Sequence, residues 1–367
     1  MLYHLASHLE DLGFPALFRY TSTRVLMAFL TSLVVGMFVG RPIIVWLFRK
    51  GYRTKERSYM AAFTASKDGT PHMGGVILLA AILAGVLLWC DLLSSRVWVL
   101  VATAGCFAAI GAVDDAAKTV KGGADAGMSE KAKSALEILL AGGFGLYLLL
   151  PVLSPFIPET TTQLYLPFIK DPVWAMPAGI FVVWAIIYFY CVSNAVNFAD
   201  GLDGLCIVPS VFVFAVFGVF AFLIGNAQLR GYLLLPDLPG SSEVAVFCAA
   251  VVGSGLAFLW FNSHPAQVFM GDTGSLMLGA LMAGVGMLLK QEFLFLVLGG
   301  FFVAEAASTL IQKAFGTAGW SGRRIFYQAP LHHALQHRGM AEPKIVTRVW
   351  IVCAVLAALS LLTLKAR

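Results

Sequence analysis

Ten long runs of apolar residues follow one another through almost the whole of the 367-residue chain. About 20 consecutive apolar residues allow an α-helix to cross the hydrocarbon core of a bilayer. Only 12% of the residues are charged, whereas soluble domains carry about 25%. The sequence therefore predicts an all-α polytopic membrane protein, with a single membrane-embedded domain over 1–367 and spans near 24–48, 74–91, 97–113, 134–154, 176–195, 205–225, 243–262, 274–289, 294–312 and 347–364.

Basic residues are distributed unevenly among the loops between these spans. The loops 49–73, 114–133 and 313–348 hold 16 of the 25 lysines and arginines. Loops rich in Lys and Arg stay in the cytoplasm, and an even number of spans returns the chain to the side on which it began. We therefore predict that these three loops are cytoplasmic and that both termini are periplasmic.

Two loops on the opposite side have some structural content. The segment 160–168 has a strand-like composition and predicts a small hairpin, in which Pro167 confines the strand to an edge. The loop 226–242 contains Pro236, Pro239 and Gly240, so we predict that it is irregular.

Five aspartates lie at the ends of apolar runs, on the side that the charge distribution makes cytoplasmic: Asp114, Asp115, Asp200, Asp203 and Asp272. An ionisable group at membrane depth is costly, so it usually marks a functional site facing a cavity or the mouth of a bundle. Clustered carboxylates are ligands for a hard divalent cation, most simply magnesium that handles phosphates. The pattern predicts chemistry on a phosphate-bearing substrate at the membrane surface.

Asn194, Asn197, Asp200 and Asp203 recur at every third position. At a helix end, this spacing would place them on one broad polar face. Asn and Asp also cap helices and form tight turns, but capping accounts for one or two such residues rather than four. We therefore expect a binding role for the set.

Asp114 and Asp115 are sequence neighbours, and successive side chains on a helix point about 100° apart. One of them can face a substrate while the other caps or orients a partner; a solvated pair at a helix exit is the alternative. Asp272 lies between Gly271 and Gly274. The sequence leaves open whether it caps the next span or binds a metal ion.

Lys67, Lys133, His332 and His333 lie in the predicted cytoplasmic loops or beside them. Lysine is a point-charge ligand for phosphates, although most loop lysines only set the topology. The two histidines fit a general acid–base element, a phosphate site or a polar loop on the lipid headgroups. Phe269, three residues before Asp272, can stack on a planar base or anchor the loop at the interface.

Five sequence blocks resemble those of a known family: S-K-x-G-T-P-x-M-G-G, V-D-D, N-A-V-N-x-x-D-G-L-D-G-L, W-F-N-x-x-P-A-Q-V-F-M-G-D-x-G-S and A-P-x-H-H. The chain resembles the phospho-N-acetylmuramoyl-pentapeptide transferases, within the polyprenyl-phosphate sugar-1-phosphate transferase superfamily. The similarity extends from about residue 20 to the C-terminal L-K-A-R. The T-P-x-M-G-G, P-A-Q-V-F-M-G-D and A-P-x-H-H blocks narrow the resemblance to this family.

The resemblance implies a multi-pass protein of the bacterial inner membrane, with a cytoplasmic cleft, a homodimeric state, dependence on Mg2+ and no nucleic-acid partner. The implied reaction joins UDP-N-acetylmuramoyl-pentapeptide to undecaprenyl phosphate, releases UMP and forms lipid I. The alternatives are a sibling transferase that uses another UDP-linked N-acetylhexosamine and, from a different class, a non-catalytic lipid carrier or transporter.

Matched position by position, the resemblance also implies a set of catalytic residues. Asp114 and Asp115 match the family's paired carboxylates, and Asp272 matches its metal-binding aspartate. Lys133 matches the lysine of the cleft. Two routes stay open: direct attack by the lipid phosphate, with Asp114 positioning or deprotonating it, and a covalent aspartyl-phosphate route.

The histidine loop matches the family less completely. His332 and His333 match its first two histidines, but Ala334 replaces the third, and His72 replaces the second threonine of T-P-T-M-G-G. The positions that the resemblance implies to bind substrate, on the uridine side or beside the cleft, are Lys67, Asn197, Asp200, Asp203, Asn262 and Phe269. The spacing of the Asn and Asp residues adds Asn194 to this substrate-binding set.

Overall fold

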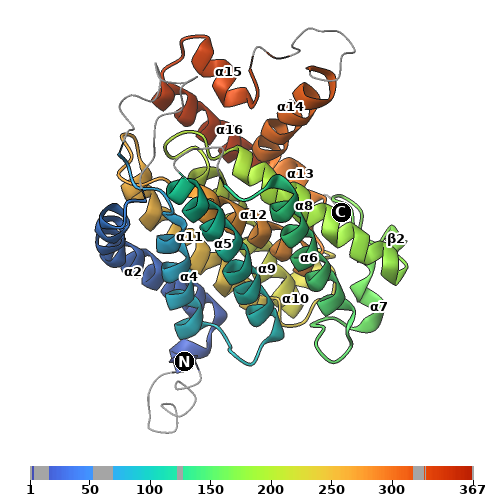
Figure 1. Ribbon diagram of the computed structural model, residues 1–367. Helices are drawn as coiled ribbons and strands as arrows, with labels where there is room; N and C mark the ends of the chain where they lie inside the picture. The colour runs from blue at the N-terminus through green and yellow to red at the C-terminus, as the bar shows by residue number, and fades with distance from the viewer. Residues whose placement is uncertain are drawn as a thin grey trace.

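The computed structural model shows a bundle of long α-helices (Figure 1). It describes residues 2–3, 16–52, 69–121, 127–316, 326 and 328–365. The long helices are α2 (Thr21–Arg49), α4 (Gly75–Trp89), α5 (Ser95–Lys121), α6 (Glu130–Leu149), α8 (Ala178–Phe198), α9 (Ile207–Gly225), α11 (Ser242–Asn262), α12 (Gly271–Leu288), α14 (Gly300–Gly316) and α16 (Glu342–Leu362). The short helices are η1 (Ala16–Arg19), α7 (Pro158–Thr161), α10 (Ala227–Tyr232), α13 (Leu294–Leu298) and α15 (Leu331–His337).

Eight of the described helices are long and apolar enough to cross a membrane: α2, α5, α6, α8, α9, α11, α12 and α16. The protein is therefore a polytopic helical membrane protein, as predicted. The apolar helix α4 is shorter, with 15 residues, and the predicted ninth span is divided at Gly299 into α13 and α14. The count of ten crossings stays a prediction. Helix α5 continues to Lys121 rather than ending at residue 113.

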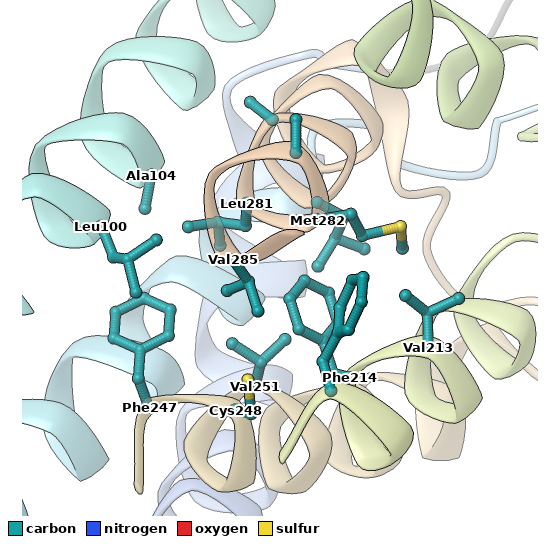
Figure 2. Packing of buried hydrophobic residues seen from close by; sticks show 14 of the residues in the cluster. Leu100, Ala104, Val213, Phe214, Phe247, Cys248, Val251, Leu281, Met282 and Val285 are labelled. Atoms are coloured by element: carbon teal, nitrogen blue, oxygen red, sulfur yellow. The ribbon is translucent and has the colours of Figure 1, made fainter. Parts of the chain in front are cut away.

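Helix α12 lies at the centre of the bundle. Every residue from Thr273 to Leu288 is buried, and the helix packs against α4, α5, α8 and α9. Figure 2 shows apolar side chains of α12 among those of α5, α9 and α11, with Leu281, Met282 and Val285 in the middle. The outer helix α2, in contrast, leaves apolar side chains such as Phe38 exposed, as expected where a helix faces lipid.

Glycines let neighbouring backbones approach the N-terminus of α12 closely. A Cβ atom added to Gly111 of α5 would lie 2.2 Å from the Asp272 carbonyl oxygen, and one added to Gly75 of α4 would lie 2.3 Å from the Gly274 nitrogen. Small residues at helix contacts are typical of membrane proteins, where close packing holds helices together. These contacts fix the helix end that carries Asp272.

The two loops for which the sequence made predictions agree with those predictions only in part: an antiparallel pair of strands forms, but it extends beyond the predicted segment. Residues 160 and 161 belong to α7, and strand β1 (Gln163–Leu164) pairs antiparallel with β2 (Trp174–Ala175), which lies beyond the predicted hairpin. The loop 226–242 contains the short helix α10, because the Asn226 side chain accepts hydrogen bonds from the backbone N–H groups of residues 228 and 229 and so caps it. The departure at α10 depends on local capping rather than on composition.

Candidate active site

Three carboxylates from two helices meet at one end of the bundle. Asp114 and Asp115 lie inside α5, and Asp272 lies in the first turn of α12. One oxygen atom from each residue lies within 4.8 Å of those of the other two. Asp114 and Asp115 are buried and Asp272 is half-buried. The fold thus joins carboxylates that are 157 positions apart in the sequence.

Two lysines neutralise part of this charge. Lys133, in the first turn of α6, places Nζ 2.6 Å from Oδ2 of Asp272. Lys118 places Nζ 3.0 Å from the same oxygen and 2.6 Å from Oδ2 of Asp114. With all five groups ionised, the cluster keeps an excess of negative charge. Lys118 is not among the predicted residues, although a lysine four positions after Asp114 shares its helix face.

Asp115 caps α12 from a neighbouring helix. Its carboxylate accepts hydrogen bonds from the backbone N–H groups of Asp272 and Thr273, at 3.2 and 3.0 Å, and from the Thr273 hydroxyl at 2.7 Å. The first amides of a helix have no partner within it, so Asp115 supplies one. Of the two aspartates, Asp115 is therefore the one that caps a partner, and the alternative of a solvated pair is wrong because both side chains are buried.

Asp114 and Asp272 direct their carboxylates into the cluster. Asp114 accepts a hydrogen bond of 2.6 Å from the backbone N–H of Met128, in addition to its ion pair with Lys118. The N-cap position of α12 is held by Met270, and the Asp272 carboxylate faces the two lysines. The alternative in which Asp272 is the N-cap of its span is therefore wrong.

Two asparagines of α8 orient different carboxylates. The side-chain nitrogen of Asn197 donates to Oδ1 of Asp272 and to Oγ of Ser275, both at 2.9 Å. Asn194, one turn earlier, donates to Oε2 of Glu137 in α6 at 2.6 Å. Asn197 thus belongs to the acidic cluster, whereas Asn194 contacts a buried glutamate that was not among the predicted residues.

The prediction that the four Asn and Asp residues share one helix face is wrong. Helix α8 ends at Phe198, so Asp200 and Asp203 lie in the turn 199–206 that follows it. Burial, together with the charges of Asp272 and Asp115, raises the pKa of Asp200 to about 8. Asp200 is therefore mostly protonated at neutral pH in this arrangement.

Asp203 belongs to a second cluster. Its Oδ2 lies 3.0 Å from Nδ1 of His264 and accepts a hydrogen bond from the backbone N–H of Ala266 at 3.2 Å. Its own backbone N–H donates to Oε1 of Glu342, the first residue of α16, at 2.8 Å. Through these bonds, the carboxylates of Asp203 and Glu342 hold the turn 199–206 against α16 and against the loop after α11.

Asn262 and Phe269 lie at the two ends of the loop that connects α11 to α12. Oδ1 of the buried Asn262 accepts a hydrogen bond from the backbone N–H of Gly204 at 3.0 Å, and its Nδ2 donates to the Val268 carbonyl at 2.9 Å. The backbone N–H of Phe269 donates to the Pro71 carbonyl at 2.8 Å, and the residue is half-buried. Asn262 therefore holds two predicted substrate-binding segments together.

His72, which replaces a threonine of the family pattern, lies at the edge of the acidic cluster. Its Nε2 lies 2.9 Å from the hydroxyl oxygen of Thr119. Burial, followed by the charge of Lys118, lowers the pKa of His72 to about 4, so the imidazole is neutral at physiological pH. Lys67 precedes His72 in the sequence and lies outside the described residues.

The two predicted histidines lie on α15. His332 is buried, and its Nδ1 lies 3.3 Å from Oε1 of Glu305 in α14. A Cβ atom added to Gly201 would lie 2.1 Å from Nε2 of His332, so the ring is pressed against the turn 199–206. His333 places Nδ1 3.0 Å from Oε1 of Gln336. Glu305 was not among the predicted residues.

The acidic cluster has the donor chemistry of a site for a hard divalent cation. Carboxylate oxygens are the ligands that magnesium prefers in proteins, and those of Asp114, Asp115 and Asp272 lie close enough to face one ion. The excess negative charge of the cluster is the charge that such an ion would offset. The residues present therefore fit a magnesium site.

Comparison with known proteins agrees with these features. Residues 97–290, which contain the acidic cluster, match the family model described as glycosyl transferase family 4. The chain is 40% identical over 372 aligned positions to the phospho-N-acetylmuramoyl-pentapeptide-transferases of Citrifermentans bemidjiense and of Geobacter sp. strain M21, and each alignment covers the whole of both chains. A membrane-embedded enzyme is thus identified, and the chain belongs to the phospho-N-acetylmuramoyl-pentapeptide-transferase family.

Proposed function

We propose that the protein transfers phospho-N-acetylmuramoyl-pentapeptide from its UDP-linked form to undecaprenyl phosphate, releasing UMP and forming lipid I. The names of its full-length relatives support this reaction. The single structural observation that carries the proposal is the position of Asp272, whose Oδ2 lies 2.6 Å and 3.0 Å from two lysine ammonium groups. Carboxylates and lysines so arranged suit a divalent cation and phosphate groups in one site.

Phosphoryl transfer needs positioning and charge neutralisation more than covalent chemistry. A magnesium ion on Asp272, beside Asp114, would offset the charge of the diphosphate and stabilise the departing UMP. Lys118 and Lys133 would bind phosphate oxygens, since both ammonium groups already lie within 3.0 Å of a carboxylate oxygen there. Asp115 would hold the end of α12, and with it Asp272, in place.

We favour direct attack by the lipid phosphate over a covalent aspartyl-phosphate route. The second pKa of a phosphate monoester is about 6, so the acceptor is largely a dianion at neutral pH and needs orientation more than deprotonation. Asp114 would supply that orientation. Purified enzyme that releases UMP from the UDP-linked substrate with undecaprenyl phosphate omitted would contradict the direct route.

The uridine side would lie where the turn 199–206 meets the loop 262–270. Asp203 is fixed in this region by His264, and Asn262 links the turn to the loop. The half-buried ring of Phe269 would stack on the uracil. Asn197, Asp200 and Lys67 complete the proposed binding set, while the proposed role of Asn194 is to orient Glu137.

The proposal includes the orientation of the protein in the membrane and its assembly. We propose ten crossings, a cleft that opens to the cytoplasm, periplasmic termini and a homodimer in the bacterial inner membrane. The division of the Lys and Arg residues between the two sides supports this orientation. If a reporter that is active only in the cytoplasm shows activity when it is fused at Arg367, the proposed orientation is wrong.

A substrate panel is the direct test of the reaction. Purified enzyme would be given undecaprenyl phosphate, magnesium and each of several UDP-linked N-acetylhexosamines, and UMP release would be measured. We expect release with UDP-N-acetylmuramoyl-pentapeptide. Preference for UDP-N-acetylglucosamine would identify a sibling transferase. Absence of magnesium-dependent release with every sugar would favour the non-catalytic lipid carrier.

A further inference from the structure

Glu305 is a buried carboxylate in α14, and the mechanism above does not use it. It is 1% exposed. Ionisable residues within membrane segments are costly and are usually kept for a function. The partner of Glu305 therefore indicates what the carboxylate does.

That partner is His332, which reaches Glu305 from α15. Oε1 of Glu305 accepts a hydrogen bond of 3.2 Å from the backbone N–H of His332 and lies 3.3 Å from the ring atom Nδ1. Among the described residues, neither Oε2 of Glu305 nor either ring nitrogen of His332 has a hydrogen-bond partner, so the carboxylate and Nδ1 are neighbours at 3.3 Å rather than a hydrogen-bonded pair. One carboxylate thus faces both the backbone and the ring of the same histidine.

The opposite edge of the His332 ring faces the proposed substrate site. Nε2 is buried and makes no hydrogen bond with the described part of the chain. A Cβ atom added to Gly201 would lie 2.1 Å from Nε2, so this nitrogen occupies the space that a side chain at position 201 would need. Gly201 directly follows Asp200 in the turn 199–206. The imidazole therefore lies between the carboxylate of α14 and the turn that carries two proposed substrate-binding aspartates.

A carboxylate beside one ring nitrogen determines which nitrogen carries the proton. The neutral imidazole has one N–H and one acceptor nitrogen, and a carboxylate partner favours the proton on the nitrogen that it faces. Here the proton would be held on Nδ1, which leaves the lone pair of Nε2 directed towards Gly201. The same carboxylate would stabilise the imidazolium whenever Nε2 accepts a proton.

We propose that Glu305 is the positioning residue that fixes the orientation and the Nδ1–H tautomer of His332. The inference rests on the proposed transferase activity only for its kinetic measurement. It also accounts for the burial of a glutamate in α14 and for the absence of a side chain at position 201.

The first test measures the tautomer without using activity. The ring nitrogens of 15N-histidine-labelled protein would be recorded by NMR, and the signals of His332, one of seven histidines, would be assigned from the His332→Ala variant. We expect the Nδ1–H form in the wild type and a mixture of tautomers in Glu305→Gln. Glu292→Gln is the matched control, because it changes another buried glutamate, which lies between α12 and α13 rather than beside His332. His332 signals that are identical in wild type and Glu305→Gln would overturn the proposal.

The second test is a double-mutant cycle on turnover. Glu305→Gln should lower kcat about 10–100-fold, the usual effect of losing the partner that orients a functional histidine, with little change in KM. Glu305→Asp should recover part of the loss. In the His332→Ala background, Glu305→Gln should cause no further loss, since coupled residues are not additive. The positioning role would be contradicted if the effects of Glu305→Gln and His332→Ala on kcat were fully additive, or if Glu305→Gln and Glu305→Asp lowered kcat equally. If the wild type releases no UMP, the proposed function fails, while the NMR comparison still decides the role of Glu305.

Discussion

The two ends of the helix bundle hold their buried charges in different ways. At the end where α12 begins, the three carboxylates of the acidic cluster face two lysines, and Asp272 stays partly accessible. At the opposite end, Arg24 of α2 pairs with Glu243 of α11 at 2.8 Å and 2.9 Å through its two terminal nitrogens, and the Asp91 backbone N–H donates to the same glutamate at 2.7 Å.

The difference distinguishes a buried ion pair that stabilises the fold from a buried cluster of charges that can bind ligands. The Arg24–Glu243 pair is balanced in charge and links two helices, so its removal should affect stability. The acidic cluster is unbalanced and half-open, so it can exchange its present contacts for a cation and phosphates. A buried charge in a membrane protein therefore indicates a function most strongly when its neighbours do not fully neutralise it.

The largest expected effect is loss of turnover in Asp272→Asn. The substitution keeps the shape and an oxygen atom but removes the charge that would hold magnesium. If the ion supplies several kcal/mol of transition-state stabilisation, turnover should fall by orders of magnitude, at about tenfold per 1.4 kcal/mol. The measurement is UMP release by monodisperse protein across a magnesium titration. The control is Asp237→Asn at the opposite end, where an exposed aspartate pairs with Arg230.

Activity of Asp272→Asn within a few-fold of wild type, with unchanged magnesium dependence, would contradict this prediction. It would move the metal site to Asp114 and Asp115 or to the Asp200–Asp203 pair.

The next largest effect is a loss of stability in Arg24→Ala. Removing one member of a buried ion pair leaves an uncompensated charge and costs about 3–5 kcal/mol. Thermal unfolding in detergent should therefore begin at a lower temperature, while kcat of the folded fraction stays unchanged. Arg41→Ala, on the exposed side of the same helix, should unfold like the wild type. A lower kcat in folded Arg24→Ala protein would show that the two ends are coupled.

A smaller effect is expected at the nucleotide. Phe269→Ala should weaken binding of the UDP-linked substrate by about 1–3 kcal/mol, the range for loss of a stacked base. Isothermal titration with and without magnesium would measure it. Phe38→Ala removes a ring that is 78% exposed on α2 and serves as the control. Unchanged affinity in Phe269→Ala would exclude this ring from the site.

The smallest effect is expected where the chain departs from its family. Ala334→His restores the third histidine of the loop, but His332 already occupies the contact with Glu305 and Gly201. Turnover should therefore change little, whereas His332→Ala should reduce it severely. The steady-state rate of both variants is the measurement. Near wild-type turnover in His332→Ala would show that the loop is structural in this protein.

Much of the fold could be predicted because a membrane imposes its own length scale. Most helix boundaries lie within a few residues of the ends of the apolar runs. The division of α13 from α14 and the pairing of β1 with β2 depend on local backbone geometry, which composition does not reveal.

The site was predictable where charge contrasts with apolar surroundings. The five aspartates stand out for this reason. The same criterion applied inside the predicted span 294–312 would have identified Glu305, and the i,i+4 spacing would have identified Lys118. The partners of Asp203 could not be predicted, because His264 and Glu342 come from distant segments and meet only in the folded turn.

The turn 199–206 has a consequence for how the enzyme is made. Its supports include His332 of α15 and Glu342 of α16. These two helices are the last of the chain, and they lie beside α14 (Figure 1). A nascent polypeptide that has inserted its earlier helices still lacks both supports. Assembly of the catalytic end therefore waits for synthesis of the last helices, so a prematurely terminated product would occupy the bilayer without acting on its lipid.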